Sequence, residues 1–249
     1  MSQQSNEHDR GASRPDGTDP ARHDEDRSED GQPRPREGSG LLTHRVVEDP
    51  VVTARALTKI YGRGENAVTA LDQVDVSVAR ARFTAVMGPS GSGKSTLLHC
   101  LSGMDRPSGG SVLLGDTDIA ALSERELAAL RLSRFGFVFQ QAHLLATLCL
   151  LDNIVLPGFL AGLRPRQEVE ARGRELMERM GISELAGSDI TEVSGGQLQR
   201  AGICRALINE PGIVFADEPT GALNSATALQ ILDLLGEIHA SGTTLVMVT

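Results

Sequence analysis

The sequence predicts an α/β domain with a mixed sheet, an antiparallel β subdomain and a helical insertion. Three observations support this fold class. A glycine-rich loop, Gly88–Thr96, lies between a short apolar run and a helical segment. Two further apolar runs of strand length, Phe135–Phe139 and Ile213–Ala216, are each followed directly by a polar residue. Helical segments separate these runs, and this alternation is typical of α/β proteins.

Composition divides the 249 residues into a tail over residues 1–45 and a domain over residues 46–249. Before His44 the tail holds ten acidic residues and six arginines, and it has almost no large apolar residue before Leu41. Such a chain buries too little apolar surface to offset its conformational entropy. We therefore predict a disordered tail of mixed but mainly acidic charge.

The formal net charge of −9 argues against nucleic acid or anionic lipid as the main partner, because Lys and Arg dominate binding to both. No apolar stretch reaches the ~18 residues of a membrane-spanning helix, and the N-terminus does not resemble a secretory leader. We therefore expect a cytoplasmic protein. Cys100, Cys149 and Cys204 lie far apart among apolar residues, which favours reduced core thiols over a disulfide framework or a metal site.

The first predicted elements are strands. Val51–Leu57 and Val74–Val78 alternate at period two, which predicts antiparallel strands with one solvent face. Tyr61, the only tyrosine, lies between them in a predicted loop before Gly62. A ring there could stack on a purine or be a half-buried loop aromatic, and the sequence leaves both open.

The next element is a phosphate-binding loop, GPSGSGKST. Its glycines let backbone N–H groups approach an anion closely, Lys94 supplies charge for the β- and γ-phosphates, and the Ser95 hydroxyl is placed to bind Mg²⁺. The predicted strand Phe83–Met87 and helix Ser95–Ser102 give the loop its required context. The candidate binding residues are Gly88, Pro89, Ser90, Gly91, Ser92, Gly93, Lys94, Ser95 and Thr96.

Further elements follow in order. The sequence predicts a strand at Ser111–Leu114, a helix at Glu124–Leu132 and a buried strand at Phe135–Phe139. Gln140 follows this last strand, where an open sheet presents its ends to ligand. Its carbonyl could reach Mg²⁺ or the γ-phosphate, and a loop-capping role is the alternative.

A helical subdomain is predicted at about residues 141–200. Helical character begins at Gln141, and Pro165 opens a helix that Gly181 ends. One face of this helix carries Val169, Gly173, Leu176, Met177 and Met180.

A second anion-binding loop follows, at Val193–Gln197 (VSGGQ), and precedes a helix over Leu198–Asn209. It holds Ser194, Gly195, Gly196 and Gln197 at a helix N-terminus. One nucleotide does not obviously need two such loops from a single subunit.

Two carboxylates end the strand Ile213–Ala216. Asp217, beside the phosphate loop, can hold Mg²⁺ through water, and Glu218 can orient or deprotonate an attacking water. A surface acid pair is the alternative. The helix Ser225–Ala240 and the strand Thr243–Thr249 complete the predicted elements.

The ordered set GPSGSGKST, Gln140, VSGGQ and IVFADEP resembles the nucleotide-binding domain of ATP-binding-cassette (ABC) transporters, over Val51–Thr249. The segments MGPSGSGKSTLL, MDRPSGG, FGFVFQQ and ADEPTGAL look most like the branch of lipoprotein-releasing, macrolide-exporting and cell-division ATPases. The resemblance implies ATP and Mg²⁺ as ligands. It implies that Tyr61 stacks on adenine and that Lys94 holds the phosphates. It further implies that Ser95 and Gln140 bind Mg²⁺, that Asp217 supports the metal, and that Glu218 is the catalytic base.

The resemblance also implies partners. Ser194 and Gly196 match a signature that in the family contacts the γ-phosphate bound by the other subunit. ATP would then lie between two head-to-tail cassettes, in a homodimer or a pair of different cassettes. We expect an ATPase subunit that powers a separate membrane permease. Bound to that permease, the subunit would lie peripherally on the inner face of the cell membrane.

Two departures from the family pattern leave an alternative open. Asn224 stands where the family usually has Asp, although it could be a plain N-cap. The chain also ends at Thr249, before the family's switch histidine. We therefore expect a C-terminally truncated cassette that binds ATP but hydrolyses it poorly. The alternative is an ATP-gated binding or assembly cassette with little turnover.

Three rival functions from other classes fit the sequence less well. A P-loop kinase or GTPase does not need VSGGQ. A DNA-maintenance ATPase would carry a long heptad insertion, which is lacking between Lys94 and Ser194. A translation-factor ATPase usually joins two cassettes, whereas one set of motifs is present here.

Overall fold

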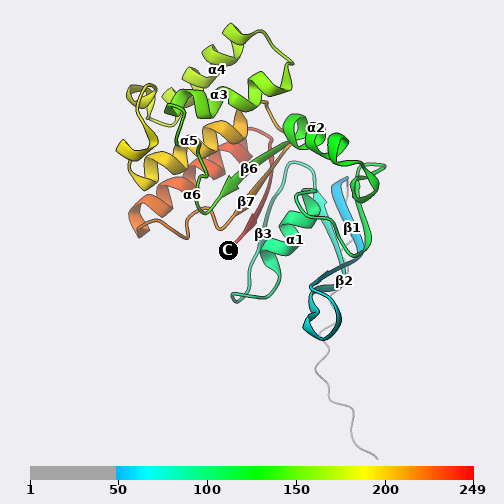
Figure 1. Ribbon diagram of the computed structural model, residues 1–249. Coiled ribbons are helices and arrows are strands. Elements are labelled where there is room, and N and C mark those ends of the chain that lie inside the picture. The colour runs from blue at the N-terminus through cyan, green and yellow to red at the C-terminus, as the bar shows by residue number, and fades with distance from the viewer. Residues whose placement is uncertain (1–48) are drawn as a thin grey trace, which may run out of the picture. The chain divides into compact units, whose positions relative to one another are not determined.

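The computed structural model describes residues 49–249, and the predicted tail over residues 1–45 lies outside them. The described chain contains two four-stranded sheets and six α-helices (Figure 1). Parallel and antiparallel strand pairs, both of which the sequence predicts, therefore lie in two different sheets.

The first sheet is antiparallel, with strand order β2-β1-β4-β5. Its strands are β1 (Pro50–Tyr61), β2 (Val68–Ala79), β4 (Gly109–Leu114) and β5 (Thr117–Asp118). β1 and β2 both extend beyond the predicted ranges. Near the ends of those ranges, Ala56 and Gln73 adopt left-handed conformations, each with φ 46°, and the register of the pairing shifts beside them. These bulges interrupt the alternation on which the prediction rested. Tyr61 is consequently the last residue of β1, and its predicted loop position is wrong.

The second sheet is parallel throughout, with strand order β3-β8-β7-β6. Its strands are β3 (Phe83–Val86), β6 (Phe135–Phe139), β7 (Ile213–Asp217) and β8 (Thr244–Val248). The carboxyl ends of all four strands therefore meet at one edge.

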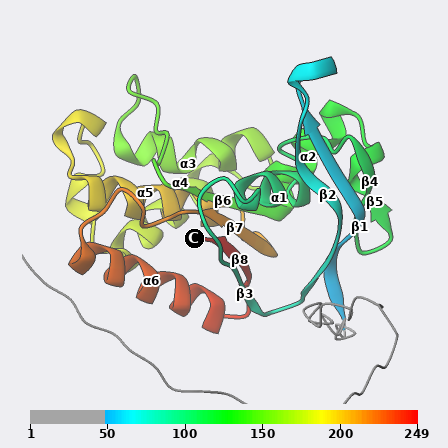
Figure 2. The ribbon, with the colours of Figure 1, turned by 90° about the horizontal axis from the view of Figure 1, so that it is seen from below.

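Alternating side chains of the parallel sheet build two separate core clusters. In β7, Ile213 and Phe215 join one cluster, while Val214 and Ala216 join the other. The first cluster includes helix α1 (Lys94–Leu101), which lies between the two sheets (Figure 2). The parallel sheet is thus apolar on both faces, and α1 is held rigidly beside its strand ends.

Five further helices surround this core: α2 (Glu124–Arg134), α3 (Leu150–Ala161), α4 (Arg166–Arg179), α5 (Gly195–Leu207) and α6 (Ser225–Ala240). Short 3₁₀ turns occur at Gly64–Asn66, Ile119–Ala121, Ser183–Leu185 and Ile190–Glu192. α4 packs closely on α3, because a Cβ on Gly173 would come within 2.5 Å of Val155. The predicted apolar face of α4 is confirmed, since it contributes Val169, Leu176 and Met177 to the core.

Residues 141–149 are not helical, so the predicted start of helical character at Gln141 is wrong. The buried side chain of Asn153 explains this loop. Its Nδ2 donates to the carbonyls of Leu145 (3.0 Å) and Leu148 (3.1 Å), which holds the chain in a turn ahead of α3.

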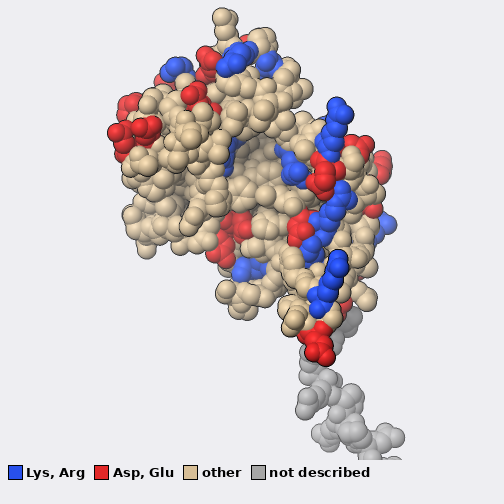
Figure 3. Space-filling model, viewed as in Figure 1, with Lys and Arg blue, Asp and Glu red and all other residues tan. Residues whose placement is uncertain are grey.

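The described surface carries charges of both signs. Along the edge formed by the antiparallel sheet, Lys and Arg side chains lie among Asp and Glu side chains (Figure 3). Within residues 49–249, no helix combines the length and apolar character that crossing a bilayer requires.

Candidate functional site

The phosphate loop joins β3 to α1 and depends on glycine at two positions. Gly91 has φ 79° and Gly93 has φ 86°, which place both in the left-handed region. At Gly93 a Cβ would also lie 2.5 Å from the Ala70 carbonyl oxygen. The predicted strand–loop–helix arrangement is confirmed, with Gly93 as the residue that caps α1.

Lys94 is the first residue of α1 and is only 9% exposed. Its Nζ donates to the carbonyls of Gly88 (2.9 Å) and Pro89 (3.1 Å), so the ammonium lies within the curve of the loop. The loop residues from Gly88 to Ser92 are all exposed. A buried cation beside free backbone N–H groups at a helix N-terminus favours a phosphate chain.

Ser95 and Asp217, both predicted to support Mg²⁺, are brought together although they lie far apart in the sequence. The Ser95 hydroxyl donates to Asp217 Oδ1 at 2.8 Å. A hydroxyl and a carboxylate are oxygen donors of the kind that Mg²⁺ combines with nucleotide phosphates, so these residues fit the metal.

His99 also contacts Asp217, a contact that the sequence analysis missed. Its Nε2 lies 3.2 Å from Asp217 Oδ2. The bond from His99 is the main factor that holds the pKa of Asp217 below its usual value; burial opposes it, and Ser95 and Lys94 add to the lowering. Ser95 and His99 are spaced i, i+4 on α1, and that spacing could have shown that they share a helix face.

Glu218 follows β7 directly and adopts a left-handed conformation with φ 44°. This conformation is uncommon for a residue with a side chain and costs free energy, so the surrounding structure must hold it. Its N–H donates to the Val248 carbonyl at 3.0 Å, and its carbonyl accepts from Gly221 N–H at 3.0 Å. The carboxylate is therefore carried on a constrained turn at the strand end.

Gln140 lies at the end of the neighbouring strand and packs on this turn. Its side chain leaves no space beside Gly221, where a Cβ would meet Gln140 Nε2 at 2.8 Å. Gln140 and the turn that carries Glu218 therefore lie side by side, although the sequence analysis identified the two residues in separate segments.

Gln199 is a further residue that the sequence analysis missed. It lies in α5, is 2% exposed, and donates from Nε2 to the carbonyls of Phe139 (2.7 Å) and Pro219 (2.8 Å). These carbonyls adjoin Gln140 and Glu218 in the chain. One buried amide group therefore connects α5 with the two strand ends that carry the candidate residues.

The second predicted anion loop begins α5. Ser194 is the N-cap, and its hydroxyl accepts from Gln197 N–H at 3.4 Å while Gln197 Oε1 accepts from Ser194 N–H at 3.0 Å. Gly196 packs on α6, since a Cβ there would lie 2.6 Å from Thr227. This reciprocal cap fixes the loop, and Ser194 and Gly195 remain exposed.

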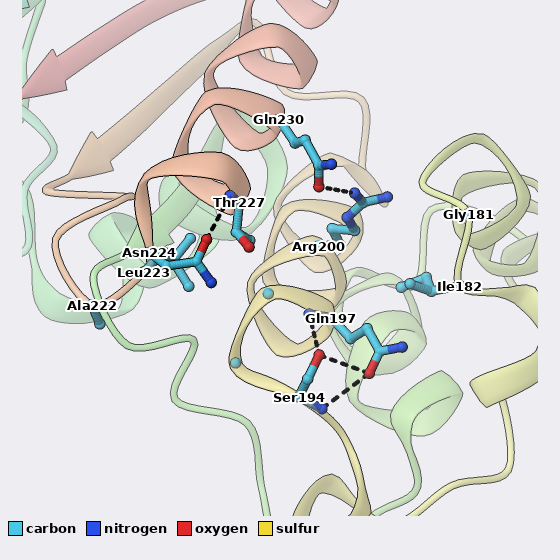
Figure 4. A pocket seen from close by; sticks show the side chains of 12 residues that line it. Gly181, Ile182, Ser194, Gln197, Arg200, Ala222, Leu223, Asn224, Thr227 and Gln230 are labelled. Carbon is cyan, nitrogen blue, oxygen red and sulfur yellow. Dashed lines mark hydrogen bonds between the residues drawn. The ribbon is translucent and has the colours of Figure 1, made fainter.

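This loop lines a pocket of about 490 Å³ (Figure 4). Across the pocket, Asn224 is the N-cap of α6, where its Oδ1 accepts from Thr227 N–H at 3.0 Å. In the described chain, no residue of Gly88–Thr96 lines the pocket. The two predicted anion loops therefore belong to separate places on one chain.

Tyr61 stands beside the phosphate-loop helix and is 42% exposed. Its hydroxyl donates to Asp105 Oδ2 at 2.8 Å. Burial raises the pKa of Tyr61, and the hydrogen bond to Asp105 raises it further. Both interpretations of the ring, stacking on a purine and covering a loop, fit this position.

Comparisons with known proteins agree with this arrangement. A family profile described as ABC transporter matches residues 71–221. The macrolide export ATP-binding/permease protein MacB 1/2 of Paracoccus denitrificans (strain Pd 1222) is 42% identical over 200 residues, covering 80% of this chain and 30% of that protein. MacB of Rhodopseudomonas palustris (strain BisB18) is 43% identical over 198 residues, with 80% and 30% covered. The chain thus spans less than a third of the length of these curated relatives.

Two solved structures share the fold. The ATP-binding cassette MJ0796, a dimer in a post-hydrolysis state bound to ADP and Pi, has a TM-score of 0.74 and 37% identity, covering 80% of this chain and 87% of that chain. CbiO1 of Clostridium perfringens, part of the ABC transporter complex CbiONQ, has a TM-score of 0.69 and 27% identity, with 81% and 78% covered. From its matched profile, its fold and the motifs gathered at the sheet edge, the chain belongs to the ABC transporter family.

Proposed function

We propose that the domain over residues 46–249, with its helical subdomain at about residues 141–200, binds ATP with Mg²⁺ and hydrolyses ATP. The observation that carries this proposal is the bond of 2.8 Å between Ser95 of the phosphate loop and Asp217 at the end of β7. It joins the phosphate-binding loop to a carboxylate, and the next residue is a second carboxylate on a constrained turn.

Each group has a distinct role in this proposal. Lys94 and the loop N–H groups bind the β- and γ-phosphates, and Ser95, Gln140 and Asp217 hold Mg²⁺. When bound there, Mg²⁺ would neutralise part of the charge on the phosphates. Glu218 accepts a proton from the attacking water or orients it, and its fixed backbone reduces the reorganisation that this step needs.

The proposed partners are a second cassette and a membrane permease. The separate positions of the phosphate loop and of Ser194 support a head-to-tail dimer, in which each chain supplies one loop to each ATP. The related cassette MJ0796 is dimeric, and the related MacB proteins are named ATP-binding/permease proteins. The chain would then act at the cytoplasmic face of a membrane, held there by its permease. The proposal includes no nucleic acid partner.

Two substitutions test the proposed roles. Lys94→Ala removes the phosphate charge, and we expect it to abolish ATP binding in a calorimetric titration. Glu218→Gln keeps the shape of the site but removes the base, and we expect nearly parental affinity with phosphate release slowed by about 10²–10⁴-fold. Glu237→Gln, an exposed change of the same kind on α6, is the matched control.

The outcomes separate the parts of the proposal. Phosphate release by Glu218→Gln at the parental rate would show that Glu218 is not the base. A parent chain that binds ATP tightly but releases no phosphate would favour the ATP-gated binding or assembly cassette.

A further inference from the structure

Lys59 and Tyr61 lie two residues apart near the end of β1, so their side chains project from the same face of the strand. The Lys59 ammonium lies over the Tyr61 ring, with Nζ 4.9 Å from the ring centroid. This cation–π contact covers one face of the ring. The tyrosine nevertheless keeps 42% of its surface exposed.

Asp105 connects both side chains. Its Oδ1 accepts from Lys59 Nζ at 2.6 Å, and its Oδ2 accepts from the Tyr61 hydroxyl at 2.8 Å. Lys59 Nζ also donates to the Arg106 carbonyl at 2.7 Å. Both carboxylate oxygens are therefore in use, and the three side chains form one connected group.

This group is fixed to the phosphate-loop helix. Asp105 N–H donates to the carbonyl of His99, in the last turn of α1, at 3.1 Å. The ring is thus tied, through Asp105, to the helix that begins with Lys94.

The connections hold the carboxylate charged in a partly buried place. The side chain of Lys59 is 12% exposed and that of Asp105 is 32% exposed. Burial acts to raise the pKa of Asp105, but the hydrogen bonds from Lys59 and Tyr61 outweigh it and keep that pKa below its usual value. Such an arrangement holds the exposed ring in one orientation, which reduces the entropy lost when a ligand stacks on it.

We propose that Lys59 and Asp105 are positioning residues for a purine base. They hold the Tyr61 ring with one face covered by the ammonium and the other free to stack on the base of a nucleotide whose phosphates occupy the loop. This inference rests on the proposed nucleotide binding and extends it to the base.

A comparison of two ligands tests the inference, because inorganic tripolyphosphate carries the phosphates of ATP but no base. In calorimetric titrations of the 249-residue chain, Asp105→Leu and Lys59→Met should each weaken ATP binding by about 3- to 10-fold, as expected for partial loss of one base–aromatic stack. Tripolyphosphate affinity should not change. Adding Asp105→Leu to Tyr61→Leu should cause no further loss, because both act through the ring.

The control is Glu124→Gln, which breaks the exposed ion pair between Glu124 and Arg106 without touching the ring. It should change neither affinity. Because the chain has one tyrosine and no tryptophan, its intrinsic emission reports on Tyr61 alone. ATP should quench this emission, and tripolyphosphate should not.

The phenol itself gives a readout that needs no ligand. Burial raises the pKa of Tyr61, and the bond to Asp105 raises it further. Ultraviolet titration of Asp105→Asn should therefore show the phenol ionising at lower pH than in the parent.

Four results would overturn the inference. Equal weakening of ATP and tripolyphosphate would show a purely structural role, and unchanged ATP affinity in both variants would show no role. If the parent binds tripolyphosphate as tightly as ATP, the base platform is wrong while the phosphate loop stands. If the parent binds neither ligand, the proposed function fails and this inference fails with it.

Discussion

The three cysteines show how position in the fold sets the chemistry of single residues. Burial raises the pKa of Cys204 to about 12 and that of Cys100 to about 11. Cys149 is half-buried at the N-cap of α3, and burial raises its pKa less strongly. The predicted core position is confirmed for Cys100 and Cys204, whereas Cys149 lies nearer to solvent.

We predict that Cys149 reacts first with a thiol reagent in the native protein. The thiolate is the reactive form, and a thiol with pKa about 11 is only about one part in a thousand ionised at pH 8. Reactivity of the buried thiols should rise only as pH approaches these raised pKa values or when the chain unfolds. Mass spectrometry after timed labelling measures each site, and native Cys204 labelled as fast as Cys149 would contradict the prediction.

At the scale of elements, α5 connects two parts of the proposed site. Its N-terminus carries Ser194, and one turn later Gln199 binds the carbonyls that adjoin Gln140 and Glu218. The helix that begins at the exposed Ser194 loop is therefore hydrogen-bonded directly to the two strand ends.

We predict that Gln199→Leu lowers the free energy of unfolding by about 2–4 kcal/mol, because two buried carbonyls lose their donor. Gln230→Leu is the matched control: Gln230 is exposed on α6 and accepts one hydrogen bond from Arg200. That change should cost less than about 1 kcal/mol, as exposed substitutions usually do. Urea unfolding measures both, and similar values for the two variants would contradict a structural role for the buried amide.

At the scale of the whole molecule, one chain carries both predicted anion-binding loops without bringing them together. The phosphate loop lies beside β7, whereas Ser194 lines a pocket with residues at the start of α6 (Figure 4). A second chain in head-to-tail orientation would place the Ser194 loop of one against the phosphate loop of the other.

We predict that ATP with Mg²⁺ drives the Glu218→Gln variant into dimers, since bound ATP is not consumed. Ser194→Arg should block dimerisation, because a bulky cation at the exposed loop would clash with the partner's nucleotide site. Ser241→Arg, exposed at the other end of α6, should leave dimerisation intact. In analytical ultracentrifugation, a Glu218→Gln chain that stays monomeric at saturating ATP would refute the head-to-tail arrangement for the isolated subunit.

The contacts that sequence analysis could not supply join residues far apart in the chain. Tyr61 and Asp105 are 44 residues apart, and Gln199 lies 60 residues from Phe139. Asp105 and Gln199 stand in segments whose local pattern predicts only a loop and a helix. Their partners depend on how β1 and α5 pack, and no short-range pattern records that packing.

By itself the sequence determined the features that depend on neighbouring residues. Gly91 and Gly93 predict a loop with left-handed backbone conformations, and alternating apolar residues predict the strands. Asp217 and Glu218 follow a buried apolar run, which predicts two carboxylates at a strand end. Only the tertiary structure decided where these features meet, because the packing of both sheet faces brings strand ends and helix α1 together. It also decided that β1 continues past its bulge to Tyr61 and that Glu218 keeps a strained backbone, since both are held by hydrogen bonds from other strands.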